Sequence, residues 1–390
     1  MSLIFRLSIC SNYFKLILKY ILNRVRTRSY FFKLSIKTNL AKKALKQVGI
    51  KQIAAEANVS IGTVDRVIHK RPGVSENTRQ KVLSIIDKHG YQRNTIASRL
   101  ASKKLIKILA LIPDPKETDY WKIQYNALLQ AAEEYAQLGF SLTCEFFSLQ
   151  NPASYSEQCT KIQTSDYDGM ITAGLFPQWG KDLWHEFQSL HKPVVFIDTR
   201  FTESKDFYNI YQNGYQGGQV AGRLMLPLIE PEKTVLLIHL ESKHHRNIND
   251  NERSKGFIDF LSERNALLNF HHITTSFSGD PKLAETLHTI FNQMDITGVF
   301  VPNSRSHEIC SLKNKLGIKS VPIIGFDVNP RNMHFMQLED IDFLIHQKPE
   351  EQATRAVQVM ANLLIHHRPI HDREHHVPIE IVVKESIPSG

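Results

Sequence analysis

Two short helical patterns meet in VGIKQIAAEANVSIGTVDRVIH, residues 48–69. In the first, apolar residues recur at the spacing of one helix face: Ile50, Ile53, Ala54 and Ala57. Asn58 and Val59 then predict a tight turn, because asparagine tolerates the left-handed conformation that such turns often need. The stretch therefore predicts two helices that are held close together by a turn.

The second helix is expected to begin after Ser60, whose side chain is a natural N-cap. Its inner stripe consists of Val64, Val67 and Ile68. A break at HKRPG, residues 69–73, precedes a third helix that starts at the cap Ser75 and ends at Gly90. Three short helices in this order match a helix-turn-helix module.

Charge divides the chain into a basic head and an acidic body. Residues 1–104 hold 22 Lys and Arg against four acidic residues, which gives +18. The remainder holds 26 basic and 35 acidic residues, which gives −9. This asymmetry predicts an N-terminal part that binds nucleic acid and a separate domain with a different function.

The first 47 residues are basic and rich in aromatic and leucine side chains, and residues 1–49 contain no acid. Three interpretations stay open: a helix on a membrane surface, an extra DNA-contacting arm, or upstream sequence outside the working protein. We favour the last, because the recognisable domain begins abruptly at Val48. The longest charge-free run, residues 7–14, is too short to span a bilayer, and no cleavage site indicates a signal peptide.

The four cysteines are far apart in the sequence: Cys10, Cys144, Cys159 and Cys310. None forms a CxxC pair, so neither a disulfide framework nor a zinc site is indicated. A reducing cytoplasm is the expected compartment.

From residue 106 the pattern changes to alternating strands and helices. Apolar runs of strand length occupy residues 106–112, 141–147, 169–173, 194–197, 235–239, 298–301 and 323–326. Helical patterns occupy residues 124–138, 217–229, 252–263, 283–294 and 306–316. Repeated βαβ units predict parallel sheets covered by helices on both faces, and the length favours two lobes over one sheet.

The head resembles the LacI/GalR family of bacterial transcription regulators. After the quoted stretch come VSENTRQKV, residues 74–82, and YQRNTIASRLAS, residues 91–102, in the order and spacing of that family's third helix and hinge. The resemblance continues to about Ser386. It implies a small all-α helix-turn-helix head and an α/β body, a two-lobed type I periplasmic-binding-protein fold with doubly wound parallel sheets. The implied divisions are an extension at 1–47, the head at 48–93, a hinge at 94–104 and an effector-binding and dimerisation domain at 105–390.

The same resemblance implies the DNA contacts. The implied residues are Ser60, Ile61, Gly62, Thr63 and Arg66 in the head and Asn94, Ala97 and Leu100 in the hinge. Arg66 is the best candidate for reading a base, because a guanidinium can bond bidentately to guanine, and Thr63 is expected near phosphate at the helix N-terminus. Leu100 corresponds to a leucine that wedges into the minor groove. Such wedging takes two copies, and this implies a homodimer on a near-palindromic operator.

Asp65 is unexpected in a helix that meets a polyanion. It is expected to pair with His69, or to orient the neighbouring Arg66. Alternatively, its carboxylate accepts a hydrogen bond from cytosine N4.

The effector site is expected where ligands bind in such sheets, at the carboxyl ends of strands. The candidates are Tyr120, Trp121, Asp198, Arg200, Arg253, Asn303, Asp327 and Gln347. Carboxylates with arginine and amides suit vicinal hydroxyls, so a carbohydrate is the expected ligand. Asp198 and Asp327 are alternatively strand-end caps, and Trp121 is alternatively a core residue. Arg305 and Gln212 depart from the family pattern, and Arg305 hints at an anionic group on the effector.

Other signals carry less weight. HHRPIHDREHH, residues 366–376, holds five histidines, but its spacing matches no zinc finger, and a solvated, pH-sensitive loop is expected. No phosphate-binding or nucleophile motif suggests an enzyme or a cofactor. The sequence thus predicts a cytoplasmic, homodimeric, carbohydrate-responsive transcription regulator with no membrane partner. The alternatives are a sugar-binding receptor without a DNA role and an α/β enzyme acting on sugars.

Overall fold

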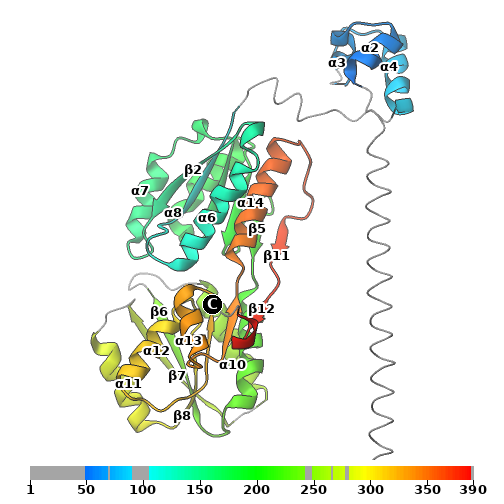
Figure 1. The fold of residues 1–390 in the computed structure, drawn as a ribbon. Helices are drawn as coiled ribbons and strands as arrows, with labels where there is room; N and C mark the ends of the chain where they lie inside the picture. Colours follow the sequence, from blue (N-terminus) through cyan, green and yellow to red (C-terminus); the bar gives the residue numbers. More distant parts are fainter. Residues whose placement is uncertain are drawn as a thin grey trace, which may run out of the picture. The chain divides into compact units, whose positions relative to one another are not determined.

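The computed structural model describes residues 49–68, 71–89, 105–241, 248–264, 267–276 and 281–387. The described residues fall into two compact units, the helices of residues 49–89 and the α/β body from residue 105 onward (Figure 1).

The first unit has the three predicted helices: α2 (Ile50–Ala57), α3 (Ile61–Ile68) and α4 (Glu76–His89). The tight turn at Asn58 is confirmed, because this residue has φ 55° and its N–H caps the end of α2. The predicted apolar faces form one small core, which contains Ile53, Ala54, Ala57, Val64, Val67, Val82 and Ile85. Gly90, the expected end of the third helix, lies outside the described residues.

The body contains two six-stranded sheets, one in each lobe. The first has the order β11-β5-β4-β3-β1-β2 and is parallel throughout. Its strands are β1 (Ile106–Pro113), β2 (Phe140–Phe147), β3 (Gly169–Ala173), β4 (Val194–Asp198), β5 (Tyr208–Tyr211) and β11 (Glu374–His376). Its helices are α6 (Asp119–Glu133), α7 (Pro152–Lys161), α8 (Pro177–Ser189) and α14 (Pro349–Leu364).

The second sheet has the order β12-β10-β9-β8-β6-β7, and only β12 is antiparallel to its neighbour. Its strands are β6 (Thr234–Glu241), β7 (Asn269–Ser276), β8 (Ile296–Phe300), β9 (Ile323–Phe326), β10 (Phe343–His346) and β12 (Glu380–Val382). Its helices are α9 (Gly214–Met225), α10 (Ile248–Ser262), α11 (Pro281–Gln293), α12 (Ser306–Lys315) and α13 (Pro330–Gln337). Alternate strand residues feed two apolar clusters, one on each face of this sheet.

The chain passes between the lobes three times, at residues 212–213, 347–348 and 377–379 (Figure 1). Gln212 stabilises the crossovers, because its Nε2 donates to the carbonyl oxygens of His346 at 3.0 Å and Pro378 at 3.4 Å. The predicted two-lobed architecture is therefore confirmed.

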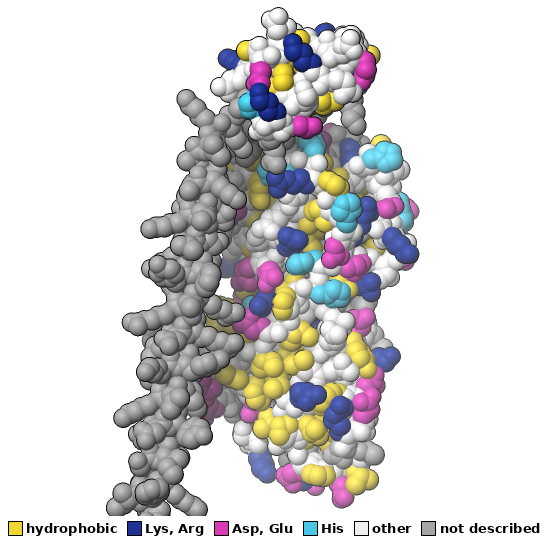
Figure 2. All heavy atoms as spheres, turned by 90° about the vertical axis from the view of Figure 1, so that its right-hand side faces the viewer, with side chains coloured by type: hydrophobic (Ala, Val, Ile, Leu, Met, Phe, Trp, Pro, Cys, Tyr) yellow, Lys and Arg dark blue, Asp and Glu magenta, His cyan; other side chains and the backbone are white. Residues whose placement is uncertain are grey.

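The histidine-rich segment, residues 366–376, differs in part from the predicted loop. Residues 374–376 form strand β11 rather than a loop, because they pair with β5 and the Arg373 carbonyl accepts from Asn209 N at 2.7 Å. The Tyr211 hydroxyl also lies 3.2 Å from His376 Nε2. Figure 2 shows the histidines of the face in view scattered among acidic and basic side chains. Within the described ranges, no three His, Cys, Asp or Glu side chains form a group that could hold a metal ion.

A further difference concerns the start of a helix. Helix α6 begins at Asp119 instead of near residue 124, because the Thr118 side chain accepts from Trp121 N at 3.2 Å and caps the helix earlier. Among the helices of the described segments, none combines the length and the hydropathy needed to cross a bilayer.

Candidate functional sites

Helix α3 presents one face to solvent. Ser60 Oγ accepts from Thr63 N at 3.1 Å, which fixes the start of the helix as a capped terminus. Val64 and Val67 are buried, while Ile61 is 46% exposed and Gly62 and Arg66 are exposed. A large aliphatic residue and an arginine on one open face of a capped helix give a surface that can meet a nucleic-acid groove.

Asp65 has a partner that the sequence did not suggest. Arg71 Nη1 lies 3.4 Å from Asp65 Oδ2, across the break that follows α3. Both side chains are largely exposed, so this ion pair stabilises the fold little. His69, the expected partner, and the hinge residues Asn94, Ala97 and Leu100 lie outside the described residues.

In the body, Asp198 lies where β4 ends and has a left-handed backbone, with φ 68°. Tyr120 Oη donates to its Oδ1 at 2.7 Å, and Thr199 Oγ1 donates to its Oδ2 at 3.0 Å. From the second lobe, Asn249 Nδ2 donates to the same Oδ2 at 3.2 Å. The carboxylate therefore joins the two lobes across the cleft.

Asp327 follows β9 in the second lobe and has almost the same backbone conformation, with φ 69°. Gln347 Nε2 donates to both of its carboxylate oxygens, at 3.0 and 2.8 Å. Gln347 Oε1 accepts in turn from Arg253 Nη2. A carboxylate, an amide and a guanidinium are thereby linked at the crossover between the lobes.

Arg253 lies on α10 at the centre of this network and is buried. Its guanidinium stacks over Phe326, with Cζ 4.3 Å from the ring centroid, and Nη1 donates to the Pro302 carbonyl at 2.8 Å. Nη1 also lies 3.4 Å from Asp250 Oδ1, while Nε has no hydrogen-bond partner among the described residues. A buried donor without a partner is costly.

Burial sets the electrostatics of the cleft. It raises the pKa of Asp327 to about 7 and raises the pKa of Asp198, although Arg253 opposes both shifts. Burial and the neighbouring Asp198 likewise raise the pKa of Tyr120 well above its usual value. The cleft therefore offers several hydrogen-bond acceptors around one cation, which suits a ligand that donates through hydroxyl groups.

Comparison with known proteins identifies both units. Residues 49–94 match the model of bacterial regulatory proteins of the lacI family, and residues 109–368 match the periplasmic binding protein domain. The chain belongs to the LacI family of bacterial transcription regulators.

This LacI-family regulator is similar along most of its length to curated repressors. It is 24% identical over 345 residues to the ribose operon repressor of Lactococcus lactis, covering 87% of this chain and 97% of that one. It is 26% identical over 353 residues to the repressor PurR of Histophilus somni, with coverages of 87% and 98%. The family membership disfavours a receptor without a DNA role.

Solved structures share the fold of the body. A putative LacI regulator from Bacteroides fragilis superposes with a TM-score of 0.67 at 19% identity, covering 72% of this chain and 98% of that one. The glucose-galactose binding protein GanP from Geobacillus stearothermophilus superposes with a TM-score of 0.62 at 21% identity, with coverages of 73% and 100%.

The structure brings together most, though not all, of the expected effector residues of this LacI-family regulator. Tyr120 contacts Asp198, while Arg253 and Asp327 both contact Gln347. Gln352 links the two groups into one network, because its Oε1 accepts from Asp198 N and its Nε2 donates to the Gln347 carbonyl at 2.9 Å. Asn303 Nδ2 joins the network by donating to Asp250 Oδ2 at 3.0 Å.

Arg200 does not join the network. Its side chain is 48% exposed and pairs with Glu374 of β11 at 2.9 Å. Trp121 is buried in the apolar core of the first lobe, edge-on to Tyr120 at 5.2 Å between ring centroids. Arg305 is half-buried and pairs with Glu308 at 2.9 Å.

Four contributors to the network were missed: Thr199, Asn249, Asp250 and Gln352. The strand-end rule could have found Thr199, which directly follows Asp198. Asn249 and Asp250 lie one helical turn before Arg253, so the helix period could have suggested them. Gln352 accepts from Asp198 N at 2.8 Å from distant α14, and no local pattern indicates that contact.

Proposed function

We propose that this LacI-family regulator is a cytoplasmic homodimer whose affinity for an operator is controlled by a carbohydrate bound between the two lobes. The observation that carries the proposal is the buried Asp198–Asp327–Arg253 network, built from both lobes. We propose the divisions 48–93 for the head, 94–104 for the hinge and 105–390 for the effector-binding and dimerisation domain. Residues 1–47 have no assigned role in this proposal.

The donor and acceptor pattern of the cleft supports a carbohydrate. Two carboxylates can accept hydrogen bonds from vicinal hydroxyls, and the free Nε of Arg253 can donate to a ring or hydroxyl oxygen. Tyr120, Asn303 and Gln347 then orient the ligand through the carboxylates that they contact. The similarity to a ribose operon repressor points in the same direction.

Operator binding is assigned to the exposed face of α3. Arg66 and Ile61 meet base edges, while Ser60, Gly62 and Thr63 place the capped helix start near phosphate. In the hinge, Asn94, Ala97 and Leu100 remain predictions from the family resemblance. The effector acts by altering the relative rotation of the lobes, and so the way in which two hinges pair.

Contacts across the cleft make such coupling feasible. Asn249 of the second lobe bonds to Asp198 of the first, and Arg331 Nε of α13 lies 3.1 Å from Asp119 Oδ2 of α6. A ligand that replaces or strengthens these bonds changes the free-energy difference between lobe arrangements.

A binding assay with the full chain tests the proposal. Fluorescence anisotropy would measure its affinity for DNA upstream of its own gene, with and without a panel of pentoses and hexoses. One sugar should change the affinity for DNA by about 5- to 150-fold. Calorimetry should show that the same sugar binds, and the sugar should be recovered unchanged afterwards. Binding to no fragment of the genome, with any sugar, would refute the proposal.

The variant Arg253→Lys separates the two functions. It should retain operator binding and lose the sugar response, because lysine cannot bridge Gln347 and Pro302 with a planar fork. The matched control is Arg264→Lys, an exposed position just beyond the end of α10. It should respond to the sugar as the parent does.

A further inference from the structure

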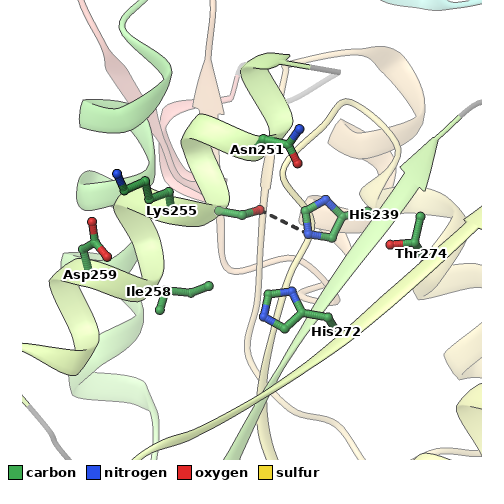
Figure 3. A pocket seen from close by; sticks show the side chains of 8 residues that line it. His239, Asn251, Lys255, Ile258, Asp259, His272 and Thr274 are labelled. Atoms are coloured by element: carbon green, nitrogen blue, oxygen red, sulfur yellow. Dashed lines mark hydrogen bonds between the residues drawn. The ribbon is translucent and has the colours of Figure 1, made fainter. Parts of the chain in front are cut away.

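A second pocket lies on the second lobe, between α10 and strands β6 and β7. It has a volume of about 440 Å³, and the residues that matter here are His239, His272, Asn251, Ser254, Lys255 and Asp259 (Figure 3). His239 alternates along β6 with Ile238 and Leu240, which face the opposite side of the sheet. The pocket is therefore on the α10 side of the sheet.

Two imidazole rings form the strand side of this pocket. Their centroids lie 6.0 Å apart with an interplanar angle of 15°, and Ser254 Oγ lies 3.3 Å from His239 Nε2. Figure 3 shows these rings facing α10, with Lys255 and Asp259 on the helix side. Asn251 and Thr274 add an amide and a hydroxyl to the lining. Hydrogen-bond donors therefore surround the space from the helix and from both strands.

The charge of the pocket depends on the two histidines. Lys255 and Asp259 offset each other, and the Tyr215 hydroxyl holds Asp259 by donating to Oδ2 at 3.0 Å. With both imidazoles neutral, the lining residues carry no net formal charge, and protonation of His272 gives them one positive charge. Desolvation lowers the pKa of His272, and the adjacent His239 and His271 lower it further. Protonation of His272 is therefore unfavourable unless a negative charge lies close to its ring.

We propose that this pocket binds a small oxyanion, a phosphate group above all, and that His272 takes up a proton as it does so. The His272 imidazolium, the Ser254 hydroxyl and the Asn251 amide donate to the oxygens of the anion. The volume exceeds that of a phosphate ion alone and lies within the range of small-metabolite sites. A phosphorylated metabolite and free phosphate share this chemistry.

The pocket is distinct from the effector cleft but shares a helix with it. Helix α10 carries Arg253 and Asn249 on its cleft side and Ser254 and Asn251 in the pocket. An anion held by Ser254 is thus one residue along the chain from the guanidinium of the cleft.

Calorimetry with sodium sulfate tests the proposal, because the charge of sulfate is constant between pH 6 and 8. The full chain is titrated at both pH values, at one ionic strength and with EDTA to remove metal ions. Linkage to one proton predicts that the affinity at pH 6 is about tenfold greater than at pH 8. Buffers with different heats of ionisation should reveal uptake of protons on binding.

The variant His272→Gln should abolish most of the pH dependence, whereas the exposed His334→Gln on α13 should bind sulfate as the parent does. Titration with inorganic phosphate and with glycerol 3-phosphate at pH 6 distinguishes the sources: tighter binding of the ester assigns a phosphorylated metabolite, and equal binding assigns free phosphate. Sulfate binding that is absent, equal at both pH values or unchanged in His272→Gln would overturn the proposal.

Discussion

Two aspartates in matching positions carry the chemistry of the cleft at the scale of single residues. Asp198 and Asp327 each follow the end of a parallel strand, one in each lobe, and both have left-handed backbones. Non-glycine residues adopt this conformation at a cost, which the surrounding hydrogen bonds must offset. The cost is consistent with a site in which the direction of each carboxylate matters more than local stability.

Asp327 predicts a pH dependence of stability. Its pKa is raised to about 7 by burial, so between about pH 4 and 7 the folded protein holds a proton that the unfolded chain has lost. Its contribution to the free energy of unfolding is therefore complete below pH 4 and is lost as pH rises to 7, by at most about 1.4 kcal/mol per pH unit. Urea unfolding at several pH values should show that the free energy of unfolding falls less steeply with rising pH in Asp327→Asn than in the parent. The exposed Asp182→Asn on α8 should retain the parent's slope, and equal slopes for all three proteins would contradict the assignment.

Replacement of Arg66 is expected to reduce the discrimination between DNA sequences. If its guanidinium reads a base, Arg66→Ala should reduce the preference for the footprinted operator over scrambled DNA by about 1–3 kcal/mol. The side chain is exposed, so the melting temperature should not change. Competition binding measures the preference, and full discrimination in the variant would remove Arg66 from the recognition surface.

At the scale of elements, α9 and α10 approach each other backbone to backbone. A Cβ on Gly218 would lie 1.9 Å from the Arg253 carbonyl oxygen, and a Cβ on Gly256 would lie 2.0 Å from that of Tyr215. Neither contact can be relieved by rotating a side chain. The two helices therefore have to move apart if either glycine is replaced.

Gly218→Ala should accordingly lower the free energy of unfolding by about 3 kcal/mol or more, because overpacking here strains the backbone. Its neighbour Gly217 gives the matched control, since a Cβ there would meet the Phe326 ring at an ordinary 3.4 Å. Gly217→Ala should be tolerated or slightly stabilising, because alanine is the better helix former. Similar urea midpoints for both variants would show that the helices adjust more easily than the contact implies.

The elements also show what sequence patterns can and cannot predict. The runs 169–173 and 323–326 coincide with β3 and β9, because strands buried on both faces are continuously apolar. Edge strand β7, with the sequence NFHHITTS, has no such run and was missed. In the cleft, strand ends pointed to Asp198 and Asp327. The partners Asn249 and Gln352 depend on how helices dock from elsewhere, which no local pattern contains.

At the scale of the whole molecule, charge separates the two tasks. Residues 50–104 hold eleven basic and four acidic residues, while the chain from residue 105 onward carries −9. DNA affinity should therefore depend on phosphate contacts of the head and fall linearly with salt on a double-logarithmic plot. For a dimer that makes about 6–10 phosphate contacts, affinity should drop about 10³- to 10⁵-fold between 50 and 200 mM salt. Anisotropy titrations measure the slope, and a slope near zero would exclude this mode of binding.

Helix α10 connects two events that a cell could otherwise regulate independently. Its backbone is packed closely against α9 at Gly218 and Gly256, and its residues line both the outer pocket and the cleft. Thermodynamic reciprocity then requires that any factor by which an oxyanion alters sugar affinity is the factor by which the sugar alters oxyanion affinity. The concentrations of the oxyanion and of the sugar would then act on one promoter through the same helix.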